Sequence, residues 1–405
     1  MGSYAIDCIR CAAAARWRAG GRDRCGTLWP VHKIGLSYFL GAEGAAPLIR
    51  NPLLDLLQAV RTQGSISAAA QALGLSYRHV WGELKRWEQE LGQPLLHWEK
   101  GQRARLSEFG DKLLWSERQA QARLAPQIEA LRAELERTFA VAFDDSAHVL
   151  TFHASHDDAL TALRHYVRTL PDSPSLHLDI RFMGSVDAIQ ALNEGRCIMA
   201  GFHTRPDAPV GSRAERTYKP LLQPGLHKLI GFATRTQGLM VREGNPLGIG
   251  GLHDLTRRDV RFVNRPLGTG TRLLLDELLD EAGLAPDQIA DYAQTEPSHG
   301  AVAQAVLAGQ ADAGLGIEAA ARARGLDFVP IATEDYLLVC LESALDTPPV
   351  TALRAVLDSA AWQATLAELP GYTPSFCGQV RAMTQVLPWW QFKRPKPGRP
   401  SARRG

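Results

Sequence analysis

The sequence has few cysteines, no long apolar run and almost no net charge. Six cysteines are spread over 405 residues, too few and too scattered for a disulfide framework in a chain of this length. The sequence contains no apolar stretch of about 18 uncharged residues, so we expect no membrane-spanning helix and no membrane partner. A formal net charge of +2 gives no general affinity for nucleic acid, so any DNA-binding face has to be local.

The motifs of common catalytic and metal sites are also missing. There is no Gly-x-Ser-x-Gly, no paired-histidine metal motif and no Gly-x-Gly-x-x-Gly after the first expected strand. Metal-ligand spacings are not found among the histidines His153, His156, His203 and His299. The Cys-x-x-Cys at 8–11 and Cys25 would supply three ligands, but a fourth in a matching position is missing. We therefore expect no enzyme, no catalytic residue, no metal site and no cofactor.

Both ends of the chain differ in composition from a folded domain. Residues 1–34 carry several arginines but no apolar segment of a secretion signal, so we expect a disordered leader and a cytoplasmic protein. Residues 388–405 end in KRPKPGRPSARRG, which is basic and contains no acid. We expect a disordered basic tail there, with at most non-specific affinity for phosphate.

Residues 35–110 show the pattern of a helix-turn-helix unit. An amphipathic helix is expected over 51–64, and Ser65 is a suitable N-cap for a second, short helix. After a tight Gly-Leu-Ser turn, Ser76 caps a third helix with Val80 and Leu84 on its apolar face. Two short helices joined in this way predict a helix-turn-helix, whose second helix enters the major groove of DNA.

The candidate DNA contacts lie on the third helix and just after it. Polar side chains crowd the first turn of that helix, where a recognition helix contacts base edges and phosphates. The following QPLLHWEKGQRARLSEFG predicts a two-stranded wing with basic residues for phosphate contacts. The alternative is a plain helical hairpin of a bundle. The residues expected to face DNA are Ser65, Ser76, Tyr77, Arg78, His79, Lys85, Arg103 and Arg105.

Residues 107–140 predict a long linker helix. Leu124, Ile128, Leu131 and Leu135 recur at coiled-coil spacing, and Pro126 is expected to kink or restart the helix. The favoured interpretation is a dimerisation helix, giving a homodimer or homotetramer. The alternative is a helix packed onto its own domain.

Residues 147–375 alternate short β-rich runs with helical segments. Such βαβ units predict a mostly parallel sheet with helices on both faces. In these sheets ligands bind beyond the carboxyl ends of strands, at the N-termini of helices.

Four strand-to-helix corners of this unit carry small polar residues. Together their N–H groups, hydroxyls and helix N-termini suit an oxyanion or a carboxylate, whereas any one corner alone is better explained as a simple helix cap. His153 and His203 are interpreted as structural. The candidate ligand-binding residues are Ser155, His156, Ser185, Gly268, Thr269, Gly270, Thr271, Ser298 and His299.

Two parts of the chain resemble known families. GSISAAAQALGLSYRHVWGELKRWEQELGQPLL at 64–96 resembles the winged helix-turn-helix of LysR-type regulators, and more closely that of molybdate-responsive ModE-type regulators. FVNRPLGTGTRLLLDELL and AVAQAVLAGQADAGLGI resemble the periplasmic-binding-protein-like domain that is fused to ModE-like helix-turn-helix domains. The resemblance implies an α/β, type II domain with two lobes, strands crossing near 232–242 and 332–341, and a ligand clamped between the lobes.

The resemblance also implies a function. We expect a one-component transcription regulator that binds double-stranded promoter DNA and responds to a small ligand. The ModE-like half suggests molybdate or tungstate, but the usual molybdate-binding module of that family is missing, so another small anion or a small carboxylate stays open. The alternative is a cytoplasmic small-ligand sensor whose helical head mediates protein–protein contacts.

Overall fold

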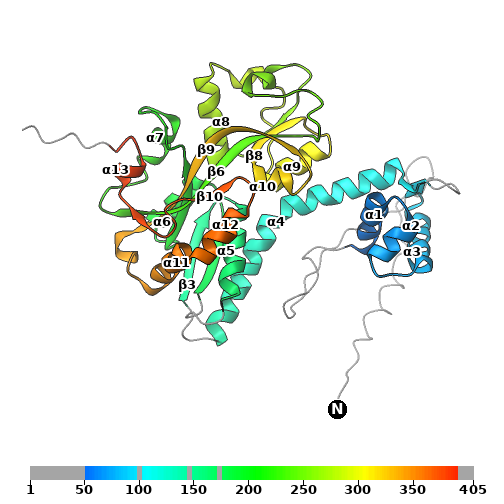
Figure 1. Cartoon of the computed structure of the whole chain (residues 1–405), viewed down its shortest axis with the longest axis horizontal. Coiled ribbons are helices and arrows are strands. Elements are labelled where there is room, and N and C mark those ends of the chain that lie inside the picture. The colour runs from blue at the N-terminus through cyan, green and yellow to red at the C-terminus, as the bar shows by residue number, and fades with distance from the viewer. Residues whose placement is uncertain (1–50, 98–102, 144–147, 171–175, 391–405) are drawn as a thin grey trace, which may run out of the picture. The chain divides into compact units, whose positions relative to one another are not determined.

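The chain divides into two compact units, residues 1–114 and 115–405, which are considered separately. The computed structural model describes residues 51–97, 103–143, 148–170 and 176–390 (Figure 1). The predicted leader at 1–34 and its cysteines lie outside these residues. Among the helices of the described part, none combines the length and the apolarity needed to cross a bilayer.

The first unit is a three-helix domain with a two-stranded wing, as the sequence predicts. Its elements are α1 (Pro52–Gln63), α2 (Ile66–Ala72), α3 (Tyr77–Leu91), β1 (Leu96–His97) and β2 (Arg105–Leu106). The two strands pair antiparallel. Just before β2, the amide of Ala104 donates a hydrogen bond of 3.0 Å to the carbonyl oxygen of Gly64. The helices share one apolar core that includes Leu57, Val60, Val80 and Leu84.

The turns of this unit follow from glycine and serine at fixed positions. Gly64 and Gly74 both have a φ of 67°, a left-handed conformation that costs a glycine little. Ser65 Oγ accepts from the amide of Ala68 at 3.1 Å, and Ser76 Oγ accepts from the amide of His79 at 3.2 Å. Each serine thereby satisfies an N–H group at the start of its helix.

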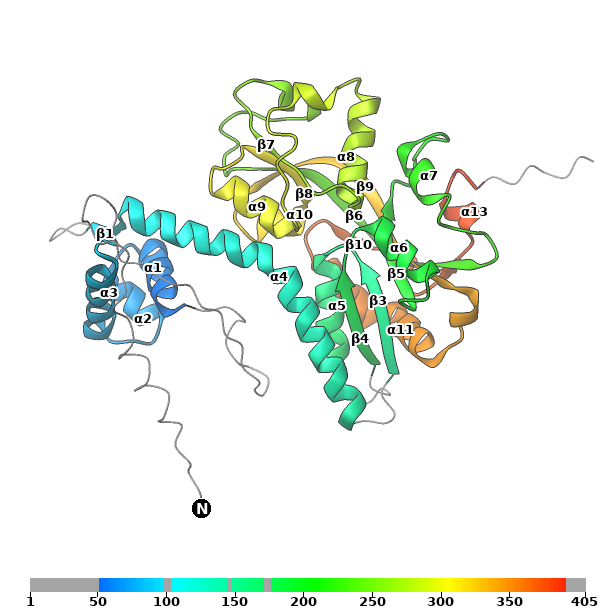
Figure 2. The same cartoon turned by 180° about the vertical axis from the view of Figure 1, so that it is seen from behind.

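Helix α4 (Glu108–Phe143) is a single element of 36 residues. It does not restart at Pro126, which is buried, but Figures 1 and 2 show that the helix bends along its length. From Trp115 onward α4 belongs to the second unit, where Figures 1 and 2 show it from opposite sides running beside α5 (Asp158–Arg168).

The second unit is built on one large sheet. Its strands are β3 (His148–Ala154), β4 (Leu176–Phe182), β5 (Met199–Thr204), β6 (His227–Val241), β7 (Phe262–Val263), β8 (Ala313–Ile317), β9 (Asp327–Leu341), β10 (Tyr372–Pro374) and β11 (Val380–Arg381). The α-helices after α5 are α6 (Ser185–Asn193), α7 (Arg213–Tyr218), α8 (Gly270–Glu281), α9 (His299–Leu307), α10 (Glu318–Arg322), α11 (Pro348–Asp358), α12 (Ala360–Ala367) and α13 (Met383–Val386). The 3-10 turns are η1 (Leu252–Thr256), η2 (Pro286–Gln288) and η3 (Glu342–Ala344).

The sheet order is β4-β3-β5-β9-β6-β8-β7, with β10 and β11 also paired to β6. β3 pairs in parallel with β4 and β5, and β7 pairs in parallel with β8. β6 and β9, however, pair antiparallel with each other and with their neighbours β8 and β5. The expectation of a mostly parallel sheet is therefore wrong at the centre, because two long strands run through it in opposite directions.

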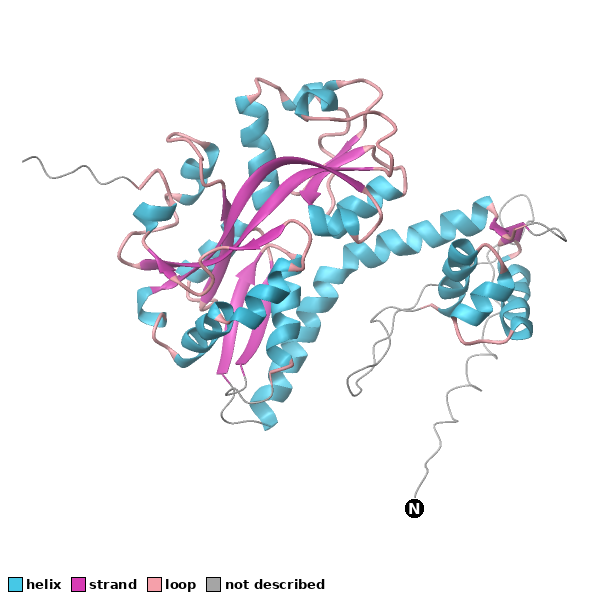
Figure 3. Ribbon diagram, viewed as in Figure 1, coloured by secondary structure: helices cyan, strands magenta, loops and turns pink. Residues whose placement is uncertain are grey.

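These two strands connect two lobes. Lobe 1 contains β3, β4 and β5 with α5, α6, α11 and α12, and lobe 2 contains β7 and β8 with α8, α9 and α10. Figure 3 shows the long curved strands β6 and β9 passing from one lobe to the other. The two-lobed arrangement and the crossing strands expected near 232–242 and 332–341 are confirmed.

The folded unit continues past residue 375, where its end was predicted. β11 pairs with β6, and Leu387 and Trp389 are buried against lobe 1. Residues 388–390 therefore belong to the folded unit rather than to the predicted tail, whose residues from 391 lie outside the described part.

A buried ionic network stands where the long strands meet lobe 1. The guanidinium of Arg235 on β6 donates to the carboxylates of Asp157 and Glu334. Gln237 donates to the same Glu334 oxygen at 2.9 Å, and the Tyr372 hydroxyl donates to Asp157 at 2.8 Å. Because one buried cation serves two buried carboxylates, its removal leaves both of them uncompensated.

We predict that Arg235→Leu lowers the free energy of unfolding by about 3–5 kcal/mol, because it leaves the Asp157 and Glu334 carboxylates buried without a cation. Arg196→Leu is the control, since Arg196 pairs with Glu194 at 2.6 Å with both side chains exposed, and such pairs contribute at most about 1 kcal/mol. Urea unfolding of the two variants measures the difference. Equal losses would contradict this account of the network.

Candidate functional site

The exposed side of α3 presents a set of polar and aromatic groups. Tyr77, Arg78 and His79 are all exposed in its first turn. Further along the same side, a Cβ added at Gly82 would meet nothing within 4 Å. The Tyr77 and Trp81 rings lie stacked with centroids 6.4 Å apart. The first turn of α3 is therefore open to a surface brought against it, as a recognition helix requires.

The other predicted DNA contacts are placed differently. The hydroxyls of Ser65 and Ser76 cap their helices. The ammonium of Lys85 pairs with Glu88 at 2.7 Å and lies 4.8 Å from the Trp81 ring centroid. Arg103 and Arg105 are exposed on the wing. The structure thus leaves the Arg103 and Arg105 side chains exposed, whereas the Lys85 ammonium forms an ion pair within its own helix.

In the second unit, three of the four predicted corners meet where the lobes touch. Ser155 Oγ and Ser185 Oγ, from the first and second corners, are 3.3 Å apart and buried. A Cβ added to Gly184 at the second corner would lie 2.6 Å from the carbonyl oxygen of Gly268 at the third. A Cβ on Gly270 would lie 3.4 Å from Ser185 Oγ. Since Gly268 and Gly270 belong to lobe 2, these corners form one interlobe surface.

Around this surface stand imidazoles with unpaired nitrogen atoms. Within the described ranges, neither ring nitrogen of His156 or His203 has a hydrogen-bond partner, and neither does Nδ1 of His299. His203 Nδ1 is 3.3 Å from the position of a Cβ on Gly270, and His299 Nδ1 is 3.2 Å from one on Gly316. Buried polar atoms are normally paired, so these nitrogen atoms mark a surface suited to a polar ligand.

The charge at this surface comes from Arg265, at the end of the strand segment that contains β7. Arg265 is 2% exposed, its Nη1 donates to the backbone oxygen of Glu296 at 3.1 Å, and no carboxylate within the described residues pairs with it. Burial, with nearby Arg235 as the second cause, lowers the pKa of its guanidinium to about 9. The side chain therefore still carries its charge at neutral pH.

The three imidazoles are neutral near pH 7. Burial lowers the pKa of His156 to about 4, with Arg265 as the next cause. Burial also holds the pKa values of His203 and His299 well below their ordinary range, with Arg235 and Arg265 adding to the effect. The effects of these groups on pKa values show that they share one electrostatic environment. We call this group of residues the interlobe cluster: His156, His203, His299 and Arg265.

The remaining predicted ligand residues have partners within the fold. Thr269 Oγ1 donates to the carbonyl of Pro266 at 2.8 Å, and Thr271 Oγ1 accepts from Gln237 at 3.1 Å. Ser298 Oγ caps α9 and donates to the carbonyl of Ala122 on α4 at 3.2 Å. The fourth corner therefore contributes His299 to the cluster, while its serine is occupied by α4.

Sequence reasoning missed two members of the cluster. His203 was interpreted as structural because it stands alone on β5, yet β5 ends at the interlobe surface. Arg265 was noticed only as part of the segment before Gly-Thr-Gly-Thr. Its signal in the sequence was a basic residue two positions after a strand and five positions before the start of a helix, at the edge where ligands bind.

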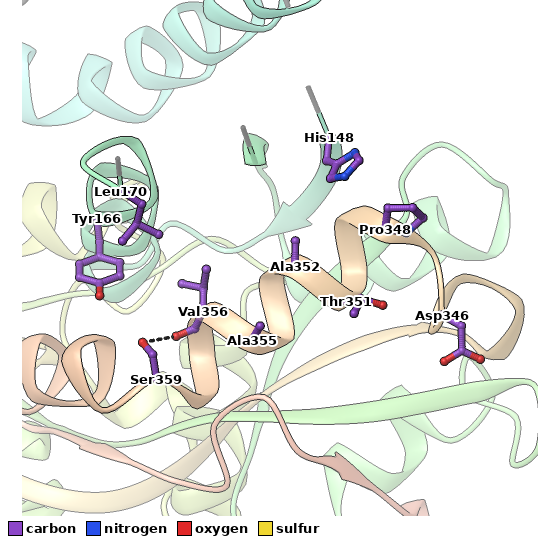
Figure 4. Close-up of a pocket in the computed structure, with 10 residues that line it drawn as sticks. All are labelled: His148, Tyr166, Leu170, Asp346, Pro348, Thr351, Ala352, Ala355, Val356 and Ser359. Carbon is purple, nitrogen blue, oxygen red and sulfur yellow. Dashed lines mark hydrogen bonds between the residues drawn. The ribbon is translucent and has the colours of Figure 1, made fainter. Parts of the chain in front are cut away.

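A surface pocket of about 650 Å³ lies elsewhere, along α11, and has a different character. Figure 4 shows its lining residues: His148, Tyr166, Leu170, Asp346, Pro348, Thr351, Ala352, Ala355, Val356 and Ser359. Its lining is mainly apolar, carries an acid, and contains none of the predicted ligand residues. The interlobe cluster is therefore better suited than this pocket to bind an anion.

No metal site is evident in the part of the chain that the structure describes, where no group of three His, Cys, Asp or Glu side chains is arranged to hold an ion. The imidazoles of the interlobe cluster lie beside a guanidinium, which disfavours a second cation. The cluster is suited to a negatively charged ligand instead.

Comparison with known proteins identifies both units. Residues 52–111 match the bacterial regulatory helix-turn-helix protein family of the lysR type, and residues 167–358 match the PBP superfamily domain. The closer resemblance to molybdate-responsive regulators is not tested by these matches.

Individual relatives carry less functional information. The uncharacterised protein YvgK of Bacillus subtilis is 34% identical over 200 residues, and the chain spans 64% of its length while the match covers 49% of the chain. An uncharacterised protein from the 5′ region of a 2Fe-2S ferredoxin gene of Clostridium pasteurianum is 32% identical over 109 residues, which cover 27% of the chain and 96% of that protein. The crystal structure of CbnR, a LysR family transcriptional regulator, is 19% identical and covers 74% of the chain and 96% of its own, with a TM-score of 0.36, too low to support a functional comparison.

The neutral state of the cluster predicts a pH dependence. A histidine whose pKa is lowered on folding favours the folded state above pH 6.5, and this contribution is lost as the pH falls towards its folded pKa. For His156, whose pKa falls from 6.5 to about 4, the loss is about 1.4 kcal/mol between about pH 7.5 and 5.5. We predict that the free energy of unfolding of His156→Asn falls by about 1.4 kcal/mol less than that of the wild type over this range. Urea unfolding at both pH values measures the difference. Identical losses would contradict a buried, neutral His156.

Proposed function

The chain joins a helix-turn-helix domain of the LysR family to a domain of the PBP superfamily, and we propose that it is a DNA-binding transcription regulator whose second unit binds a small anion between its lobes. The observation that carries this proposal is the interlobe cluster. Among the described residues, it combines a buried guanidinium that has no carboxylate partner with imidazole nitrogen atoms that have no hydrogen-bond partner. These groups lie at the point where the two lobes meet.

The first unit supports binding to double-stranded DNA. Its exposed α3 carries Arg78 and His79 in the first turn, and the wing carries Arg103 and Arg105. In winged helix-turn-helix domains the second helix of the motif enters the major groove, and basic residues around it contact phosphates. The proposed partner is a promoter site, read by Tyr77, Arg78 and His79.

The second unit supports an anionic effector. A buried cation without a carboxylate partner is costly, and an anion seated against it removes that cost. The neutral imidazoles and the hydroxyls of Ser155 and Ser185 supply hydrogen-bond donors around the same point. Molybdate, tungstate, another small oxyanion or a small carboxylate is the proposed ligand class.

An effector acts only if it binds two states of the protein with different affinity. Groups from both lobes form the cluster, so a ligand contacting all of them binds the closed arrangement of the lobes most tightly. We propose that this difference sets the affinity of the first unit for DNA. The stripe formed by Leu124, Ile128, Leu131 and Leu135, of which Leu131 is 50% exposed, supports assembly of a homodimer or homotetramer through α4.

The DNA-binding half is tested by Arg78→Ala. This change is predicted to weaken binding to the chain's own promoter by about 1–3 kcal/mol, because a guanidinium that reads a base contributes that much to discrimination. A gel shift at fixed salt measures the loss. Arg196→Ala, on the exposed surface of the second unit, is the matched control and leaves the affinity unchanged. A wild-type protein that binds no DNA favours the protein-contact sensor instead.

The anion-binding half is tested by Arg265→Met. Without anion, the free energy of unfolding of this variant is predicted to equal or exceed that of the wild type. Replacing a buried charge that has no carboxylate partner by an apolar side chain is often neutral or stabilising. At about 100 times its dissociation constant, a bound oxyanion stabilises the wild type by about 2.7 kcal/mol, and the variant loses this gain. Thermal unfolding with molybdate, tungstate, sulfate, phosphate and small carboxylates measures both effects.

Two outcomes of that experiment contradict the proposal. One is that none of the anions stabilises the wild type. The other is that Arg265→Met is stabilised as much as the wild type, in which case the anion binds elsewhere. Arg322→Met is the control, because Arg322 is exposed and pairs with Glu318 on the same helix, and it keeps the full anion response.

A further inference from the structure

Helix α4 contacts both lobes of the second unit through separate groups. Residues 119–123 contact lobe 2, and residues 129–137 contact lobe 1. Both sets of contacts lie on one continuous helix, Glu108–Phe143, with Pro126 between them. A change in the angle between the lobes therefore has to bend α4 further or alter one of the two sets.

The contact with lobe 2 centres on the Glu296 carboxylate. Arg123 forms two hydrogen bonds with it, of 2.8 and 2.6 Å, and Gln119 donates to it at 2.9 Å. The side chain of Glu296 is only 5% exposed, and that of Arg123 is 53% exposed. Beside them, Ser298 Oγ donates to the carbonyl of Ala122 at 3.2 Å. These contacts form a compact polar anchor, which we call the lobe-2 anchor: Gln119, Ala122, Arg123, Glu296 and Ser298.

The contact with lobe 1 is equally polar. Arg164 donates to the backbone oxygen of Glu129 at 3.1 Å and approaches the Glu129 carboxylate at 3.5 Å. Near the end of α4, Arg137 pairs with the buried Asp179 at 3.4 Å. Ala133 is buried between these points. The C-terminal half of α4 is thus fixed to lobe 1.

The lobe-2 anchor and the contact of α4 with lobe 1 both adjoin the interlobe cluster. The backbone oxygen of Glu296 accepts from the guanidinium of Arg265 at 3.1 Å, so one residue contacts α4 with its side chain and the cluster with its main chain. Ser298 immediately precedes His299. On the lobe 1 side, the Glu129 carboxylate lies 3.8 Å from Nε2 of His156. Movements of the groups that surround the ligand position therefore reach α4 through direct contacts.

We propose that α4 is a strut between the lobes, and that Glu296 is the positioning residue through which α4 responds to a ligand in the interlobe cluster. The inference rests on the proposed function, since it takes an anion in this cluster as the signal. With α4 fixed to lobe 1, a shift of lobe 2 acts on the lobe-2 anchor, whose α4 residues lie on the part of the helix nearer to Glu108. The N-terminal turns of α4 then change with the ligand.

The test is hydrogen exchange of the full-length chain, read over residues 116–126 of α4. Glu296→Gln is expected to speed exchange there about tenfold, because hydrogen bonds to a buried charged group contribute about that factor to local stability. Molybdate and sulfate, each at a concentration that saturates its thermal shift, change exchange of this segment in the wild type and leave it unchanged in Glu296→Gln.

Two controls keep the result specific. Glu134→Gln makes the same substitution on an exposed part of α4 and behaves like the wild type. Exchange of β4 reports the stability of lobe 1 and is the same in all variants. If Glu296→Gln also speeds exchange of β4, Arg123→Gln replaces it, since this change removes the same ion pair from the exposed side and is expected to reproduce the local effect.

The outcomes separate the strut from the proposed effector. If an anion stabilises the wild type but exchange of residues 116–126 does not change, the strut is overturned and the anion site stands. If no anion stabilises the wild type, the proposed effector fails. The anion-free proteins then decide the strut: exchange in Glu296→Gln and Arg123→Gln that is as slow as in Glu134→Gln overturns it.

Discussion

The buried guanidinium of Arg265 is the constraint on which the second unit depends. A second buried arginine, Arg235, is compensated by Asp157 and Glu334, whereas the Arg265 guanidinium donates to a backbone oxygen and has no carboxylate partner within the described residues. A charge held in this way is costly unless an opposite charge joins it. The contrast between the two arginines assigns them different tasks: Arg235 holds the strands together, and Arg265 is available to a ligand.

The fold brings this charge to the contact between the lobes. β6 and β9 are shared by both lobes, and the network around Arg235 fixes them to lobe 1. The corners that end β4 and β7 then meet closely, since a Cβ on Gly184 would lie 2.6 Å from the carbonyl oxygen of Gly268. Helix α4 is fixed to both lobes beside this point, so Glu296 contacts both the proposed ligand position and residues 119–123 of the linker helix.

Much of this architecture could be predicted from local patterns. Ser65, Ser76, Thr269 and Ser298 were recognisable as caps, and all four accept from the amide of their helix. The packing of α4 onto its own unit was only the alternative interpretation, because hydrophobic spacing selects its leucines while the contact face uses Gln119, Ala122 and Ala133. The role of Arg265 was also hidden, since burial and the absence of a carboxylate depend on chain segments that are distant in sequence.

The most direct test of the central claim is the position of the anion itself. Crystals of the full chain grown with tungstate would locate the metal atom by anomalous scattering. The account predicts one strong peak between the lobes, with tungstate oxygens within hydrogen-bonding distance of the Arg265 guanidinium and of at least one imidazole of the interlobe cluster. A tungstate that stabilises the protein in solution but gives its peak elsewhere, such as the pocket along α11, would contradict the account.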